Sequence, residues 1–391
     1  MPRKAKSEFP RRLYVLDVSR GLAALAVVLW HWQHFGYEGT SQSASFVRSE
    51  QPFYGVLRLF YEHGAMGVQY FFLLSGFVFF WLYRDPVRSG LVGAKQFAVQ
   101  RFSRLYPLHL ATLIMAAMLQ LLYVGRTGAP YVYPFNDGYH LLLNLLFASH
   151  WGFQKGWSFN APSWSVSVEI VLYIFFFVFA CRGPRGIVFS LASSALAFVL
   201  YFKLSHSDLL LGLAGFLMGG AVFYFVESVS TCQVAWKRAL YGAALGAWLL
   251  VLFSVYVYDL IPFIAGLGDV GNILLTFFPL YIVFPLTIGS LAMLEAGQAF
   301  SAKSMAWMGD LTYSSYLLHF PLQVVCALLV SGGLLAADFY KNPMALIAFF
   351  GVLILASRFT YHHFEMPLQQ LIRHRWLPSS GRFVSPSQQA H

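Results

Sequence analysis

Arg20 and His31 are ionisable residues in an otherwise apolar stretch, "LDVSRGLAALAVVLWHWQHF". Eleven positions separate them, about three turns of an α-helix, so we expect both side chains on one face, about 16 Å apart along the axis. A neutral imidazole accepts a proton from a hydroxyl group near neutral pH, which makes His31 a candidate general base. A histidine hydrogen-bonded at a membrane interface is the open alternative. Asp17, three residues before Arg20, is a candidate ion-pair partner.

A second polar group lies in "RFSRLYPLHL", where Arg101 and Arg104 are three residues apart. This spacing places both guanidinium groups on one face of a helix. Paired guanidinium groups suit the recognition of phosphates or carboxylates. The alternative is that they bind inner-leaflet lipids and only help to orient the chain in the membrane.

A third group is Ser165, Glu169 and Tyr173, spaced by four residues in "PSWSVSVEIVLYIFFF". They share one helix face, and Glu169 lies about 10 Å from the outer end of that helix, close to the depth expected for His31. A buried carboxylate needs a partner, so we expect Glu169 to pair with His31 and to orient its imidazole. A structural hydrogen bond to another helix is the alternative.

The C-terminal third contributes further polar residues. In "GDLTYSSYLLHFP", His319 is a further site candidate near the middle of an apolar segment, and Pro321 predicts a kink. In "YHHFEMP", a polar group including Glu365 is best explained by an interface.

Small residues predict where helices pack closely. Ser75 and Gly76 interrupt "GVQYFFLLSGF", and two GxxxG pairs occur at Gly215–Gly219 and Gly242–Gly246. Such residues let helix backbones approach each other within a membrane. We interpret them as packing sites with no chemical role.

The elements that must position these residues are membrane-spanning helices. Of the 391 residues, 58% are hydrophobic and only 11% are charged, against about 25% in an ordinary soluble protein. The mean hydropathy is +0.61. The sequence therefore predicts an all-α, polytopic helix bundle rather than a soluble fold. We expect ten spans, at about 13–35, 65–83, 104–124, 162–181, 186–203, 208–226, 237–257, 272–294, 309–332 and 343–364.

The charges predict the orientation of this bundle. An even number of spans puts both termini on one side, and most of the 26 lysines and arginines then fall in inner segments. We therefore expect a basic cytoplasmic tail at 1–12, a membrane domain at 13–367 and a cytoplasmic tail at 368–391 that is disordered from about residue 378. The net charge of +10 then reflects orientation rather than binding of nucleic acid.

Two outer features are expected between the third and fourth spans. The segment 138–151 is too short to cross a bilayer, so it predicts an interfacial or re-entrant helix. The loop 125–161 is rich in tyrosine, tryptophan and phenylalanine. It either roofs a cavity or forms part of an interfacial aromatic belt.

Several kinds of chemistry find no support in the sequence. Cys181, Cys232 and Cys326 are scattered, without CxxC pairs or metal-ligand spacing, so we expect neither disulfides nor a metal site to hold the fold. The chain also lacks Walker, GxGxxG, HExxH and GxSxG motifs.

Five motifs in order resemble the acyltransferase 3 family of integral membrane acyltransferases. They are the Arg-x₁₀-His of "SRGLAALAVVLWH", "FFLLSGF", "RFSRLYP", the Ser-x-x-x-Glu of "WSVSVE" and, more loosely, "TYSSYLLHFP". The correspondence runs from Leu16 to about Pro367. It departs at the end, because "EMPLQQ" has no basic residue after its proline until Arg373, so nothing specific is carried over there.

The resemblance implies an enzyme that transfers an acyl group, often acetyl, from cytoplasmic acyl-coenzyme A to a hydroxyl of a carbohydrate or other acceptor. The coenzyme is a co-substrate, and no bound cofactor is expected. His31 is the implied catalytic residue, and Arg20, Arg101 and Arg104 are implied to serve the donor or the site geometry. Ser165 and Tyr173 are candidates for stabilising the oxyanion.

The expected acceptor is an exported polysaccharide or its lipid-linked precursor, and the expected location is a bacterial inner membrane. A secreted small metabolite is the alternative acceptor. A different class of function is a secondary transporter that uses Arg20, His31 and Glu169 as a proton or substrate relay. Transporters often contain two internal halves, and this sequence shows no repeat.

Overall fold

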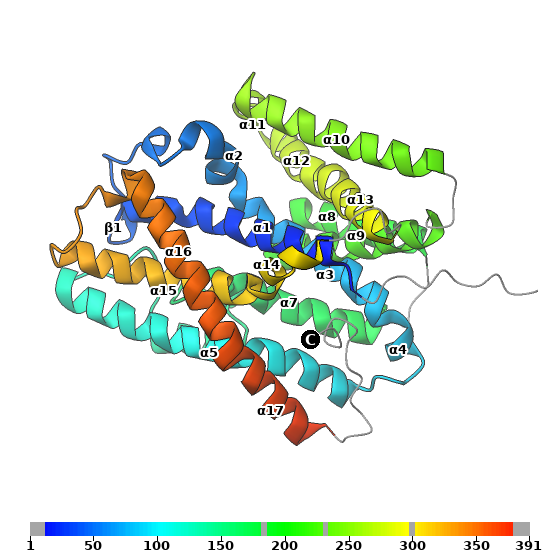
Figure 1. Ribbon diagram of the computed structural model, residues 1–391, viewed down its shortest axis with the longest axis horizontal. Helices are drawn as coiled ribbons and strands as arrows, with labels where there is room; N and C mark the ends of the chain where they lie inside the picture. The colour runs from blue at the N-terminus through cyan, green and yellow to red at the C-terminus, as the bar shows by residue number, and fades with distance from the viewer. Residues whose placement is uncertain (1–11, 181–185, 230–233, 297–301, 378–391) are drawn as a thin grey trace, which may run out of the picture.

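The computed structural model describes residues 12–180, 186–229, 234–296 and 302–377 as a bundle of α-helices (Figure 1). Ten helical segments in these ranges are long and apolar enough to cross a membrane, which confirms the predicted fold class and the number of spans. Cys181, Cys232 and the segment from residue 378, which was predicted to be disordered, lie outside the described residues.

The elements follow one another along the chain as a series of helices with one short pair of strands. The α-helices are α1 (Tyr14–Trp30), α2 (Tyr54–His63), α3 (Gly67–Leu82), α4 (Arg84–Arg88), α5 (Ala94–Thr127), α6 (Gly138–Leu145), α7 (Trp164–Phe175), α8 (Ile187–Leu200), α9 (Asp208–Val229), α10 (Val234–Tyr256), α11 (Leu260–Ala265), α12 (Asp269–Phe277), α13 (Phe284–Ala296), α14 (Trp307–Asp310), α15 (Thr312–Ser331), α16 (Pro343–Thr360) and α17 (Met366–Trp376). Single π-helical turns occupy Phe176–Ala180, Tyr201–Ser205, Phe278–Val283 and Tyr361–Glu365. The strands are β1 (Tyr37–Glu38) and β2 (Ser41–Gln42), paired antiparallel.

Three spans are clearly longer than the apolar pattern predicted, and the last of them runs to Trp376 instead of ending near residue 364. The second begins at Tyr54, because α2 runs through a 3₁₀ turn into α3, and the third begins at Ala94, ten residues before the apolar run. Hydropathy detects only the part of a helix that suits hydrocarbon, so polar ends are missed. The predicted short helix in 138–151 is α6, with Asp137 as its N-cap.

Small residues allow close contact between α3 and α9. A Cβ atom added at Gly76 would collide with the carbonyl oxygen of Phe216, and one added at Gly219 would collide with that of Leu73. The predicted close packing is therefore confirmed at both glycines. The Gly242–Gly246 pair does not lie at a close helix contact in the described residues, because a Cβ atom added at either glycine would meet nothing within 4 Å.

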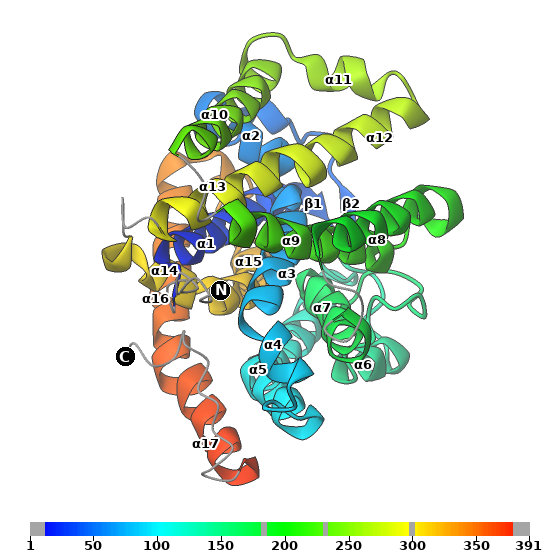
Figure 2. The same ribbon diagram turned by 90° about the vertical axis from the view of Figure 1, so that its right-hand side faces the viewer.

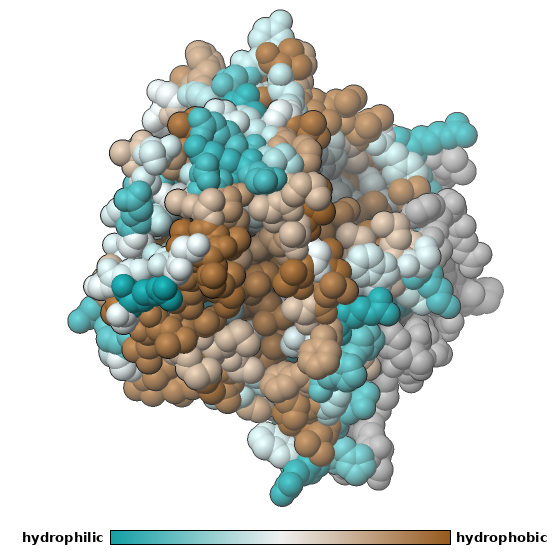
Figure 3. All heavy atoms as spheres, turned by 60° about the vertical axis from the view of Figure 1, so that its left-hand side comes forward, coloured by the Kyte–Doolittle hydropathy of each residue, from teal (hydrophilic) through white to brown (hydrophobic). Residues whose placement is uncertain are grey.

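The helices form two groups around α1 and α3. On one side, α5 lies against α15 and α17, and on the other α10, α12 and α13 stand apart from them (Figures 1 and 2). Large apolar side chains remain exposed on the outer helices, including Leu249 of α10 and Leu355 of α16. Broad apolar areas are visible on the face shown in Figure 3, as expected for a surface in contact with lipid tails.

Candidate active site

His31 lies at the end of the first span, where the helix tightens. The α1 helix ends at Trp30, and His31 opens a 3₁₀ helix (His31–Gly36). Its Nδ1 lies 2.9 Å from the carbonyl oxygen of Val27. A carbonyl can only accept, so Nδ1 carries the hydrogen and Nε2 keeps a lone pair. The ring is buried, with 6% of the residue exposed. A general base needs such an available nitrogen.

Three residues surround His31 and complete what we call the histidine group: His34, His319 and Gln323. The ring centroid of His31 lies 4.9 Å from that of His34 and 4.8 Å from that of His319. Gln323 joins the group, because its Oε1 accepts a hydrogen bond from His34 Nδ1 (3.0 Å) and its Nε2 donates to the backbone oxygen of His31 (2.9 Å).

The structure brings His319 to His31, although they are far apart in sequence. His319 is fully buried, and its Nδ1 donates to the carbonyl of Tyr316 at 2.7 Å. The α15 helix runs continuously through Pro321. Sequence reasoning missed Gln323 and gave His34 no role. Helical spacing could have indicated both residues. His34 is three residues from His31 and Gln323 is four residues from His319, so each pair lies on one face of a helix.

Glu169 does not contact His31 within the described residues, so the predicted pairing is wrong in this structure. Its Oε1 accepts hydrogen bonds from Tyr173 and, at 3.2 Å, from Ser75. The shared face of Glu169 and Tyr173 is confirmed by their hydrogen bond. Depth along a helix was the basis of the prediction, and depth does not fix the direction in which a side chain points.

Ser165, on the same helix, belongs to a different contact. Its hydroxyl lies 2.9 Å from that of Tyr316, and the Tyr316 ring centroid is 5.9 Å from that of His319. Each hydroxyl can donate only one hydrogen bond, so the pair leaves one hydroxyl hydrogen unused. Ser165 is thereby linked to the histidine group through Tyr316.

Three arginines gather where α5 meets α17, and we call them the arginine group: Arg101, Arg104 and Arg373. Arg101 donates to the Tyr83 hydroxyl, and its guanidinium carbon lies 4.7–5.9 Å from the ring centroids of four aromatic residues, Phe79, Tyr83, Phe97 and Tyr173. The flat guanidinium suits such an aromatic cage. Its Nε is buried and has no hydrogen-bond partner among the residues that the structure describes.

Arg373 joins this group from the last helix. Its Nε donates to the Ser103 hydroxyl at 3.0 Å, and it interacts electrostatically with Arg101 and Arg104. Arg104 is in turn influenced by the charges of Glu169 and Glu365. Sequence reasoning set Arg373 aside because it lies too far from "EMP" for the motif. The sequence did not show that the last span continues through α17, and this continuation is what brings Arg373 to α5.

Arg20 is held by contacts at the other end of α1. It forms the predicted ion pair with Asp17 at 3.4 Å, and it donates to the carbonyl oxygen of Gly309 at 2.8 Å. Arg12 bridges Asp17 (2.7 Å) and Asp310 (2.9 Å), which ties α1 to α14. Arg20 also interacts electrostatically with Arg104. Arg20 is therefore held by Asp17 and Gly309, and its charge acts on the arginine group through Arg104.

No group of three or more His, Cys, Asp and Glu side chains in the described ranges has an arrangement that could hold a metal ion.

Together, the fold and the two polar groups define a multi-pass integral membrane protein with a buried histidine site. A family model described as an acyltransferase domain (acyltransferase 3) matches residues 13–362, and the chain belongs to this family of acyltransferases. The resemblance of the five motifs is thereby confirmed.

Two curated proteins are similar to the chain. It is 35% identical to the acyltransferase MdmB of Streptomyces mycarofaciens over 118 residues, covering 29% of the chain and 27% of that protein. It is 31% identical to protein 2 in the picA locus of Rhizobium radiobacter over 187 residues, covering 45% of the chain and 85% of that protein. No solved structure matches.

Proposed function

We propose that the chain transfers an acyl group, acetyl in the first instance, from acyl-coenzyme A to a hydroxyl of a carbohydrate acceptor at a bacterial inner membrane. The expected acceptor is an exported polysaccharide or its lipid-linked precursor. Membership of the acyltransferase family supports the reaction type. The hydrogen bond from His31 Nδ1 to Val27, which leaves Nε2 available as a base, is the observation that carries the mechanism.

The proposed chemical step is direct transfer. His31 Nε2 takes the proton of the acceptor hydroxyl as its oxygen attacks the thioester carbonyl. The tetrahedral intermediate then collapses, the carbon–sulfur bond breaks, and the imidazolium returns the proton to the departing thiolate. The products are the acyl ester and the free coenzyme thiol. The spare hydroxyl hydrogen of the Ser165–Tyr316 pair is a candidate donor to the oxyanion.

The arginine group is the proposed site for the phosphates of the donor. It gathers three cations, and guanidinium groups recognise phosphate oxygens well. The long pantetheine arm of the coenzyme would then bring the thioester toward the histidine group. Glu169 takes a different role from the one expected. It partly offsets the charge of Arg104 and, with Tyr173, helps to position the arginine group.

The test is transfer from labelled acetyl-coenzyme A by the purified full-length protein in lipid vesicles. His31→Ala and His31→Gln should each lower the rate by about 10²–10⁴-fold, the usual contribution of a general base. Thermal unfolding and membrane extraction show that the variants are folded and inserted. Full activity in a folded His31→Ala protein would refute the role of His31. Uptake of label into vesicles without acyl transfer would favour a transporter.

A further inference from the structure

Pro321 removes one hydrogen bond from the helix that carries His319. In an α-helix, the backbone N–H of residue 321 would donate to the carbonyl of Leu317, four residues earlier. Proline has no N–H, and its ring crowds that carbonyl. Nevertheless, α15 continues as one helix from Thr312 to Ser331. The Leu317 carbonyl therefore needs a donor from outside the helix, because an unpaired backbone group inside a membrane domain is costly.

Asn160 supplies that donor. Its Nδ2 atom lies 2.9 Å from the Leu317 carbonyl oxygen. A carbonyl oxygen can only accept, so the nitrogen of the amide must face it. Asn160 is 2% exposed and Leu317 is 0% exposed, so bulk water does not take the place of this contact. The side-chain amide thus replaces the backbone hydrogen bond that Pro321 cannot form.

The replaced hydrogen bond closes the turn of α15 that contains His319. Members of the histidine group lie on both sides of Pro321, since His319 precedes it and Gln323 follows it. Both contact His31. The His319 ring centroid lies 4.8 Å from that of His31, and Gln323 donates a hydrogen bond of 2.9 Å to the His31 backbone oxygen. Proline is a usual site of sharp helix kinks. A bend at Pro321 would therefore change how His319 and Gln323 lie against His31.

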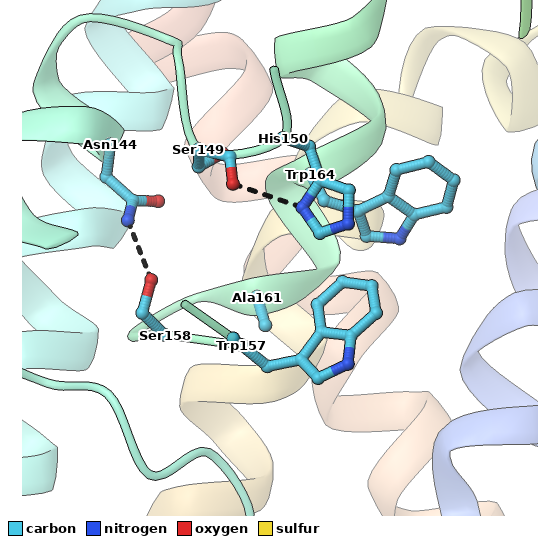
Figure 4. Close-up of a pocket in the computed structure, with 8 residues that line it drawn as sticks. Asn144, Ser149, His150, Trp157, Ser158, Ala161 and Trp164 are labelled. Atoms are coloured by element: carbon cyan, nitrogen blue, oxygen red, sulfur yellow. Dashed lines mark hydrogen bonds between the residues drawn. The ribbon is translucent and has the colours of Figure 1, made fainter. Parts of the chain in front are cut away.

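The chain around Asn160 is itself fixed. The hydroxyl of Ser158 accepts a hydrogen bond of 2.9 Å from the Asn144 side chain of α6, at the wall of a small hollow (Figure 4). The backbone nitrogen of Phe159 donates to Oδ1 of Asn136 at 2.6 Å. The 3₁₀ turn that follows Asn160 also packs against α15. The amide of Asn160 is therefore presented to α15 from a segment that is held on both sides.

We propose that Asn160 is a positioning residue of the histidine group. Its amide takes the place of the missing N–H of Pro321 and so keeps His319 and Gln323 in place against His31. The asparagine and the proline then act as a pair, and removal of one should be offset by removal of the other. This inference rests on the proposed role of His31 in acyl transfer.

The test is a pair of compensating substitutions in the full-length protein in lipid vesicles, assayed with acetyl-coenzyme A and the de-O-acetylated surface glycan of the source cells. Asn160→Ala should lower kcat about tenfold, the factor equivalent to one hydrogen bond to a buried group, and leave the KM for acetyl-coenzyme A unchanged. Pro321→Ala restores an N–H that can donate to Leu317, so the double variant should recover most of the wild-type kcat. Pro107→Ala, at a proline inside α5, is the matched control and should recover none of it in the Asn160→Ala background.

Hydrogen exchange separates this inference from the proposed function, because it needs no acyl transfer. Backbone amides of α15 near Pro321 should exchange faster in Asn160→Ala than in the wild type, since a turn that lacks its hydrogen bond opens more easily. They should return to the wild-type rate when Pro321→Ala is added. Unchanged exchange in Asn160→Ala would refute the positioning role, whether or not an acceptor is acylated.

The kinetic results can overturn the inference as well. An unchanged kcat in Asn160→Ala would do so, and so would equal recovery by Pro321→Ala and Pro107→Ala. A lower kcat that Pro321→Ala does not restore would point instead to direct substrate binding by Asn160 Oδ1, which is buried and has no hydrogen-bond partner in the described part of the chain. If Asn160→Ala fails to insert into the membrane, the double variant should insert again, and its failure to do so would count against the pairing.

Discussion

At the scale of single residues, the hydrogen bonds of the backbone determine what the imidazoles can do. The carbonyls of Val27 and Tyr316 each accept from an Nδ1, which leaves the Nε2 atoms of His31 and His319 as acceptors. Two neutral rings can lie 4.8 Å apart without repulsion between charges. The site therefore holds His31 in the neutral form that a base requires.

Arg373 allows a prediction at this scale. If the arginine group binds the phosphates of the donor, Arg373→Gln should raise the KM for acyl-coenzyme A about tenfold, with a smaller effect on the acceptor KM, because a charge-assisted hydrogen bond is lost. Steady-state kinetics with the purified protein measure both values. Arg375→Gln, two residues away on the exposed surface of the same helix, is the control. Equal effects of both substitutions would point to a general loss of positive charge.

Part of the site was predictable from the sequence. Spacing placed His31 in a buried segment, Glu169 beside Tyr173, and Arg20 beside Asp17, since neighbours along a helix follow from its geometry. The contacts between helices did not follow, because they depend on how each helix is rotated. Thus His319 rather than Glu169 lies against His31, and Arg373 reaches α5 from the end of the chain.

At the scale of elements, the crossing of α3 and α9 supports the site. The glycines bring the two backbones together, and α3 carries Ser75, which hydrogen-bonds to Glu169 of α7. A displacement of α3 would therefore reach the carboxylate next to the arginine group. The small residues predicted to serve packing alone thereby also help to position the site.

Gly76→Ala tests this crossing. The added methyl group would collide with the carbonyl oxygen of Phe216, and backbone atoms cannot move aside as a flexible side chain can. We expect a loss of about 1–3 kcal/mol in stability, the usual cost of overpacking, and a lower thermal unfolding temperature in detergent. Gly242→Ala is the control, since its methyl group meets nothing within 4 Å. Equal stability of the two variants would contradict the close contact.

The elements themselves were largely predictable, because a span needs about 20 apolar residues and each one is visible as a run. The ends of the elements were not predictable. The α5 helix begins ten residues before the expected start of its span, and the last span extends through a π turn to Trp376. Polar helical ends gain their stability from neighbouring helices, here from contacts between α5 and α17, which hydropathy does not record.

At the scale of the whole molecule, ten helical segments of the described ranges are long and apolar enough to cross a membrane. An even number of crossings returns the chain to the side on which it started, so we predict that both ends of the membrane domain lie on one side. The prediction that this is the cytoplasmic side rests on the distribution of lysine and arginine. It places the loop before α5 inside and the strand pair after α1 outside.

Cysteine labelling tests this orientation. In a cysteine-free background, Ser45→Cys and Ser89→Cys add thiols to two exposed loops that flank the second span. A maleimide that cannot cross membranes should label Ser45→Cys in intact cells, and should label Ser89→Cys only after the cells are opened. The reverse pattern would invert the predicted topology.

The length of two helical segments has a further consequence. Both α5 and the last span contain 34 residues, about 51 Å of helix at 1.5 Å per residue, whereas the hydrocarbon core measures about 30 Å. The surplus must be taken up by tilt or by projection into water. Since α5 and α17 pack together and carry the arginine group, bilayer thickness sets how far that group stands above the lipid tails. If the arginine group binds the donor as proposed, we expect the acyl-chain length of the surrounding lipids to control the access of that water-soluble donor.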